Sequence, residues 1–152
     1  MKFWDTSAIV PLCVIEPNSG TVKSILSGDP SMVVWWATRT ECVSALMRQT
    51  RDGSLRIEDQ RQARQVLSQL ENAWIEVQPS EILRGTAERI LAVHALRAAD
   101  SFQLAAALHW CQRQTTNMEF VSFDSRLREA SYREGFTLFP ADLRLTKETR
   151  LE

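Results

Sequence analysis

Residues 32–41 read Met-Val-Val-Trp-Trp-Ala-Thr-Arg-Thr-Glu, and this stretch decides the fold class. Its first five residues are apolar, and most are β-branched or aromatic, which is typical of a buried strand. Thr38 then offers a helix start, and the run that follows ends at Asp52-Gly53. The sequence therefore predicts a strand over Met32–Trp36 and a helix over Thr38–Arg51.

The same alternation of short apolar runs and longer amphipathic runs continues in both directions along the chain. Further strands are expected at Lys2–Trp4, Trp74–Val77, Glu119–Phe123 and Phe136–Phe139, and further helices at Gly20–Leu26, Glu58–Asn72, Ser80–Leu96, Asp100–Gln114 and Ser125–Arg133. Strands separated by helices favour parallel pairing. We expect a three-layer α/β domain over residues 1–145, with a mostly parallel central sheet flanked by helices, and a polar tail over residues 146–152.

One helix carries an apolar side that we expect to face the core. In the helix over Ser80–Leu96, capped by Ser80, the predicted inward-facing residues are Ile82, Leu83, Ala87, Ile90 and Leu91.

Length and composition favour a single globular domain, since 152 residues with 44% hydrophobic and 24% charged side chains can bury a core. No apolar run approaches the ~20 residues of a membrane helix, and the first residues show no secretory signal. The three cysteines are widely spaced, which excludes a zinc ribbon or a disulfide framework and favours a cytoplasmic location. The net charge of −1 indicates no strong field, although 15 of the 18 Lys and Arg residues are Arg, whose planar fork suits phosphate.

Four acidic residues are expected at one edge of the sheet. Asp5 and Asp124 directly follow apolar strands, whereas Glu41 and Asp100 lie in the first turns of helices. A helix that packs antiparallel to its strands begins at their carboxyl ends, and ligands of open parallel sheets bind beyond those ends. The element order therefore predicts that Asp5, Glu41, Asp100 and Asp124 share one crevice.

Helix capping is an alternative role for each acid taken singly. Thr38 and Glu41 have capping-box spacing, as do Asp100 and Gln103, and Asp124 precedes a helix directly. The four acids together favour a site, because clustered carboxylates repel one another unless a cation lies between them.

Oxygen ligands without His or Cys favour Mg²⁺, with Mn²⁺ as an alternative, over zinc. Such an ion can activate water and neutralise charge on phosphate, which is the chemistry of phosphodiester hydrolysis. Thr6 and Ser122 flank the acids and are candidates for bonding a carboxylate, a metal-bound water or a phosphate. For Ser7, which is also nearby, turn stabilisation is the favoured role.

The motifs around the acids resemble those of PIN domains, and among these the VapC-type ribonuclease toxins of bacterial toxin–antitoxin pairs. The matching segments are Trp4–Ala8, Trp35–Cys42, Leu96–Ala107 and Phe120–Leu127, each carrying one acid in order. The resemblance covers nearly the whole chain. One departure is Ser101, where such toxins often carry a small apolar residue.

The resemblance implies an Mg²⁺-dependent endoribonuclease that acts as a toxin. It implies that Asp5 and Asp100 are the main metal ligands, with Asp124 also at the metal, and that Glu41 and Asp124 hold the ion through water or direct the attacking water. It further implies a homodimer and a cognate antitoxin protein that inserts a segment near the acids.

Arginine and tryptophan side chains near the acids are further candidates for contacts with a substrate. Arg39, Arg97 and Arg126 lie within three residues of an acid and are candidates for holding substrate phosphates or pairing with the acids. The pair Trp35-Trp36 is a candidate for base stacking, although we expect at least one of the two in the core.

A Cys/His nucleophile is an alternative to the acids, and the residues that could form one are Cys42, His94, His109 and Cys111. Structural roles are favoured for these four, because nucleophiles usually occupy exposed turns.

Two other functions remain open at this point. A PIN-fold nuclease with a housekeeping role in RNA processing or DNA-flap cleavage shares the same acids. A receiver-like regulatory module also places an Asp and an ion at strand ends, but Asp5 is not followed by another acid and Phe136–Pro140 carries no Lys.

Overall fold

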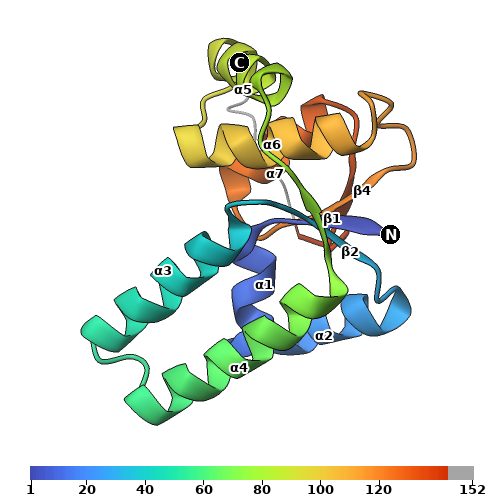
Figure 1. The fold of residues 1–152 in the computed structure, drawn as a ribbon. Coiled ribbons are helices and arrows are strands. Elements are labelled where there is room, and N and C mark those ends of the chain that lie inside the picture. Colours follow the sequence, from blue (N-terminus) through green and yellow to red (C-terminus); the bar gives the residue numbers. More distant parts are fainter. Residues whose placement is uncertain (144–152) are drawn as a thin grey trace, which may run out of the picture.

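The computed structural model describes residues 1–143 and contains a five-stranded sheet in which every neighbouring pair of strands is parallel (Figure 1). The strands are β1 (Lys2–Trp4), β2 (Met32–Trp35), β3 (Ile75–Val77), β4 (Glu119–Val121) and β5 (Thr137–Phe139). Their order is β3-β2-β1-β4-β5. The predicted α/β class is confirmed, with a sheet that is parallel throughout in these residues.

The strand order has one point where the direction of winding reverses, between β1 and β4. The chain adds β2 and then β3 on one side of β1, and afterwards adds β4 and β5 on the other. Crevices at such switch points are where open α/β sheets bind ligands. The order also differs from the 2-1-3-4-5 order of receiver-like domains, which argues against the regulatory alternative.

Helices cover both faces of the sheet, so the domain has three layers (Figure 1). The helices are α1 (Thr6–Cys13), α2 (Ser19–Gly28), α3 (Thr38–Arg51), α4 (Ile57–Ala73), α5 (Glu81–Val93), α6 (Ala98–Trp110) and α7 (Ser125–Arg133). Figure 1 shows α1 to α4 on one face of the sheet and α5 to α7 on the other. Each face therefore buries its own core.

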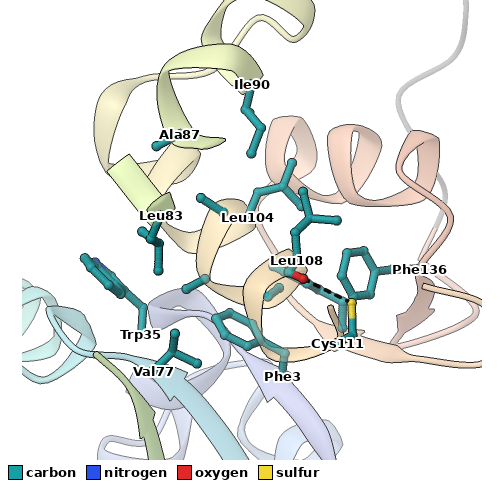
Figure 2. Packing of buried hydrophobic residues seen from close by; sticks show 14 of the residues in the cluster. Phe3, Trp35, Val77, Leu83, Ala87, Ile90, Leu104, Leu108, Cys111 and Phe136 are labelled. Atoms are coloured by element: carbon teal, nitrogen blue, oxygen red, sulfur yellow. Dashed lines mark hydrogen bonds between the residues drawn. The ribbon is translucent and has the colours of Figure 1, made fainter. Parts of the chain in front are cut away.

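The two cores follow from the alternation of side chains along the short strands. Phe3 packs into the core between the sheet and helices α5 to α7. Its neighbour Trp4 packs into the core between the sheet and helices α1 to α4. Phe120 and Val121 divide in the same way on β4. Figure 2 shows the first of these cores, in which Leu104 and Leu108 of α6 lie at the centre. Strands buried on both faces explain the continuous apolar runs in the sequence.

Helix α1 was not predicted, and it contains Pro11, which disfavours a helix interior locally. The helix nevertheless runs from Thr6 to Cys13, and Ala8, Ile9, Val10 and Pro11 are buried. Burial of this apolar side stabilises a helix that Pro11 disfavours locally. The other predicted helices are present, with ends that differ by a few residues, and the tail predicted from Thr146 lies outside the described residues.

The prediction for α5 is wrong at two inward-facing positions. Leu83, Ala87 and Ile90 are buried as expected, but Ile82 is 72% exposed and Leu91 is 42% exposed. A single helical stripe contains residues three or four apart, and Ile82 and Leu91 lie on its two flanks. The helix also ends at Val93, before the predicted Leu96. Within the described residues, no helix is long and apolar enough to cross a membrane.

Candidate active site

Asp5 and Asp124 lie at the switch point of the sheet, one at the end of each strand that borders it. Asp5 follows β1 and Asp124 follows β4 by three residues. The backbone N–H of Asp5 donates to the carbonyl of Val121 at 3.2 Å, which holds the two strand ends together. Glu41 is in the first turn of α3 and Asp100 in the first turn of α6. All four acids are therefore at the carboxyl edge of the sheet.

Asp5 is 4% exposed and is held by a network of serine hydroxyls. The hydroxyl of Ser7 donates to Asp5 Oδ1 at 2.7 Å and accepts the backbone N–H of Phe123 at 2.9 Å. Ser122 Oγ lies 3.4 Å from Ser7 Oγ and accepts the backbone N–H of Asp124 at 3.1 Å. The two serines thus connect the loop after β1 to the loop after β4. Ser7 contacts the acid directly, beyond the turn-stabilising role that the sequence favoured.

The charge of Asp5 is strongly disfavoured in this environment. The pKa of Asp5 is raised to about 7, mainly by burial and also by the negative charge of Asp124, although hydrogen bonds from Ser7 and Ser122 lower it. A buried carboxyl beside a second carboxyl is an arrangement that a bound cation would stabilise.

Glu41 is held by two side chains from other elements. The hydroxyl of Thr6 donates to Glu41 Oε2 at 2.5 Å, and the side-chain amide of Gln103 donates to the same oxygen at 2.8 Å. Gln103 Nε2 also lies 3.0 Å from Thr38 Oγ1 and 3.3 Å from Thr6 Oγ1. Gln103 is buried and was missed as a site residue, because its spacing from Asp100 suggested a capping box.

The capping alternatives have different outcomes for the individual acids. Ala37 is the N-cap of α3 and Arg97 that of α6, and neither helix has a side-chain cap bond. Asp124 does cap α7, since its Oδ1 accepts the backbone N–H of Leu127 at 2.8 Å. Asp5 occupies the N-cap position of α1 but makes no side-chain cap bond. Glu41 bonds into the site, as described above.

Asp100 interacts electrostatically with both Asp124 and Glu41. Partial burial raises its pKa, and the negative charges of Asp124 and Glu41 raise it further, whereas the Arg97 backbone N–H and guanidinium lower it. Asp5 in turn is affected by Asp124. The four acids therefore share one electrostatic environment.

The acids are not gathered into a finished coordination sphere. Among residues 1–143, no three acidic, His or Cys side chains are positioned to hold a metal ion as they stand. Asp5, Glu41 and Asp124 are each turned toward hydrogen-bond donors of their own. The chemistry of the acids nevertheless fits a bound ion, because the set offers only carboxylate and hydroxyl oxygens, which hard divalent ions prefer.

The three candidate arginines differ in their relation to the acids. Arg39 forms an ion pair with Glu71 at 3.0 Å, and Arg97 is the one whose charge acts on Asp100. Arg126 is exposed on α7.

The thiol and imidazole groups have surroundings that disfavour nucleophilic chemistry. Burial raises the pKa values of Cys42 and Cys111, which keeps both as thiols. The ring of buried His94 lies 2.9 Å from Glu134, and His109 is exposed.

Comparisons with known proteins agree with this geometry. The family description that matches is the PIN domain, over residues 2–131. Among solved structures, the chain is similar to VapC20 of Mycobacterium tuberculosis, a sarcin–ricin loop cleaving toxin, with a TM-score of 0.67 and 18% identity over 90% of this chain and 96% of that chain. It is also similar to FitAcB from Neisseria gonorrhoeae, with a TM-score of 0.65 and 16% identity over 93% and 98% of the two chains. A toxin–antitoxin complex from Klebsiella pneumoniae matches with a TM-score of 0.59 and 14% identity over 83% and 88%. A comparison with curated protein sequences finds no match. Because the matched region spans most of the sequence, the chain belongs to the PIN domain family.

Proposed function

We propose that the chain is a divalent-metal-dependent endoribonuclease and the toxin of a toxin–antitoxin pair. The observation that carries the proposal is the acidic cluster at the switch point, where burial and the negative charge of Asp124 raise the pKa of both Asp5 and Asp100. Membership of the PIN domain family supports nuclease chemistry at these acids. The similar structures include a toxin that cleaves the sarcin–ricin loop, which supports RNA as the substrate.

Asp5, Asp100 and Asp124 are the residues that would hold the ion, which we propose to be Mg²⁺, with Mn²⁺ as a substitute. When bound, such an ion would neutralise charge on the phosphodiester and acidify a coordinated water. In this arrangement Ser7 and Ser122 keep Asp5 in place through the contacts between the two strand-end loops. Carboxylate ligands that are themselves hydrogen-bonded are held in a fixed orientation.

Glu41 is proposed to direct the attacking water. Thr6 and Gln103 both bond to Glu41 Oε2, and within residues 1–143 no hydrogen bond reaches its Oε1. The carboxylate is thus fixed on one side while its other oxygen can accept a proton from water. A base fixed in this way contributes through orientation as well as through proton transfer.

A cognate antitoxin and a second copy of the chain are the proposed protein partners. Two similar structures are described as a toxin–antitoxin complex from Klebsiella pneumoniae and as FitAB bound to the IR36 DNA fragment. The exposed apolar residues Ile82 and Val93, which lie on the same flank of α5, offer a surface for one of these partners. A housekeeping PIN nuclease would share the same chemistry and differ in having no antitoxin.

The direct test is cleavage of single-stranded RNA by the wild-type chain and by Asp5→Asn, with Mg²⁺ and with EDTA. Asp52→Asn is the matched control, because Asp52 is exposed in the turn after α3, at the opposite end of that helix from Glu41. We expect the wild type and Asp52→Asn to cleave only with the metal, and Asp5→Asn to lose at least 100-fold in rate, roughly the size of loss seen when one stabilising group is removed from an active site. Cleavage by Asp5→Asn at the wild-type rate, or cleavage that survives EDTA, would contradict the proposal. Growth arrest by the wild type that co-expression of the neighbouring gene relieves would distinguish a toxin from a housekeeping nuclease.

A further inference from the structure

A hollow of about 420 Å³ lies at the same carboxyl edge of the sheet as the acidic residues, beside the ends of β2 and β3. Its walls include Trp35 and Trp36 at the end of β2, Pro79 beyond the end of β3, Glu81 and Arg84 of α5, and Phe102 of α6. This volume falls within the range of roughly 300–1,000 Å³ that is usual for small-molecule sites. The hollow therefore has the size to take a compact planar group.

The aromatic side chains in the hollow are ordered by contacts with one another. The rings of Trp35 and Phe102 stack with centroids 5.5 Å apart and an interplanar angle of 2°. Trp36 meets Trp35 edge-on at 6.4 Å and 70°. Figure 2 shows Trp35 at the rim of the core, beside Leu83 and Val77. The aromatic wall is thus anchored in the core and is rigid on its inner side.

Trp36 differs from Trp35 in being 53% exposed, although its backbone is fixed. The N–H of Trp36 donates to the carbonyl of Val77 at 3.0 Å, which ties it to β3. Leaving a large aromatic side chain half in water loses much of the stabilisation that its burial would give. A fixed backbone with an exposed indole is a suitable platform for stacking another aromatic ring.

The charges in the hollow favour a neutral ligand. Arg84 and Glu81 form an ion pair at 2.9 Å, so their charges offset each other. A phosphate or a carboxylate would meet Glu81 as well as Arg84. A nucleobase is planar and neutral, and the pair offers it both hydrogen-bond donors and acceptors.

The hollow is joined to the acidic site by two short stretches of chain. Phe102 follows Asp100 by two residues on α6, and Trp36 precedes Glu41 by five residues at the start of α3. Gln103, which is next to Phe102 in the sequence, also donates to Glu41 at the acidic site, so the hollow and the acids meet along the first turns of α6. We therefore place a nucleotide next to the cleaved phosphodiester at the hollow.

We propose that this hollow binds one unpaired base of the RNA substrate, stacked on Trp36, next to the bond that is cleaved. The inference rests on the proposed nuclease function and adds a substrate requirement to it. In a duplex both faces of a base are already stacked, so the hollow selects single-stranded segments, loops or flipped bases. An apolar segment of a partner protein is the competing occupant, and the experiment separates the two.

The test measures binding of a fluorescently labelled, mixed-sequence 12-nucleotide single-stranded RNA in EDTA, which prevents metal-dependent cleavage in every variant alike. Trp36→Ala should weaken binding by roughly 5- to 150-fold, the effect expected from losing one base–aromatic stack. Trp36→Phe, which keeps an aromatic face, should recover part of the affinity. Tyr132→Ala on α7 is the matched control, because Tyr132 is also an exposed aromatic residue and lies outside the hollow.

A second set of strands, each with one abasic nucleotide, identifies the contact itself. For the wild type, we expect one abasic position near the cleavage site to reduce affinity, and for Trp36→Ala the same position should have no further effect, since the two changes remove one interaction. Equal binding by Trp36→Ala and the wild type would overturn the inference, as would abasic effects that are the same in both proteins or a wild type that does not bind the strand. Loss of antitoxin binding alone would assign the hollow to a protein. Because these measurements need no catalysis, their failure is distinct from a failure of Asp5→Asn to block cleavage.

Discussion

The side-chain amide of Gln103 donates a 2.8 Å hydrogen bond to Glu41 Oε2, and this contact joins α6 to α3 at the acidic site. The same nitrogen lies within 3.0 Å of Thr38 Oγ1. A neutral amide at this position orients the carboxylate of Glu41 without forming an ion pair with it. Gln103 is therefore a positioning residue in our account.

Replacing Gln103 tests this role. We expect Gln103→Met, which keeps the approximate length without the amide, to lower kcat by about 10- to 100-fold, as is usual when a group that orients a functional side chain is lost. Gln103→Glu should be at least as damaging, because a second carboxylate beside Glu41 raises the pKa of both groups and moves the lower limb of the pH–rate profile to higher pH. Steady-state kinetics of RNA cleavage over pH 5 to 9 would measure both effects. Wild-type kcat and an unchanged pH profile in both variants would remove Gln103 from the mechanism.

Asp5→Asn should stabilise the metal-free protein while abolishing activity. The pKa of Asp5 is raised from its ordinary value of 3.8 to about 7 in the folded state, mainly by burial, so the folded protein disfavours the charged form. Stability is then lost as the pH rises from about 4 to about 7 and changes no further above that. In EDTA, the Tm gain of Asp5→Asn over the wild type should be several degrees at pH 8 and small at pH 4.5. Thermal unfolding followed by circular dichroism would give both values, and a gain that is larger at low pH would contradict the pKa direction.

Added Mg²⁺ should reduce that difference. An ion that binds only the folded protein stabilises it by an amount that grows with its concentration. The wild type is expected to gain Tm with Mg²⁺ at pH 8, whereas Asp5→Asn should gain little. A titration from micromolar to millimolar Mg²⁺ in the same unfolding assay would show this, with Ca²⁺-free buffer throughout. Equal Tm gains in the wild type and in Asp5→Asn would show that the ion binds away from Asp5.

Arg128 is expected to stabilise the edge of the sheet next to the site. Its guanidinium is buried and donates to the carbonyls of Ser122, Phe139, Pro140 and Leu143 at 2.9 to 3.0 Å. Arg128→Met would leave buried carbonyls without a donor, at about 1–3 kcal/mol each, so a loss of about 3 kcal/mol or more in the free energy of unfolding is expected. Arg133→Met on the same helix is the control, since Arg133 is exposed. Urea denaturation would measure both, and equal midpoints would show that the carbonyls find other partners.

Much of the site followed from element order. Asp5 and Asp124 were placed correctly at one edge because each follows an apolar run, and neighbouring parallel strands end at the same edge. The burial of Ile82 and Leu91 on α5 was predicted wrongly, because helical periodicity identifies the apolar side of a helix but not how wide its buried part is. Helix α1 was not predicted; burial of its apolar side outweighs the local effect of Pro11, and that burial depends on the tertiary structure.

The contacts that shape the site were less accessible from sequence. The spacing of Asp100 and Gln103 fits a capping box, and only the meeting of the first turns of α1, α3 and α6 at the sheet edge shows that Gln103 bonds to Glu41. Likewise, Ser7 could be recognised as a turn residue, but its contact with the loop after β4 spans 116 positions in the chain. Such long-range contacts depend on the tertiary structure, for which a single sequence gives no direct signal.

Binding of Mn²⁺ measures the central claim most directly, that Asp5, Asp100 and Asp124 form one site for a hard divalent ion. Electron paramagnetic resonance of free Mn²⁺ would follow the titration of the wild type, Asp5→Asn, Asp100→Asn and the control Asp52→Asn. We expect the wild type and Asp52→Asn to bind the ion with equal affinity, and the two site variants to bind at least 10-fold more weakly, with Mg²⁺ competing in each case. Unchanged Mn²⁺ affinity in both Asp5→Asn and Asp100→Asn would contradict the account.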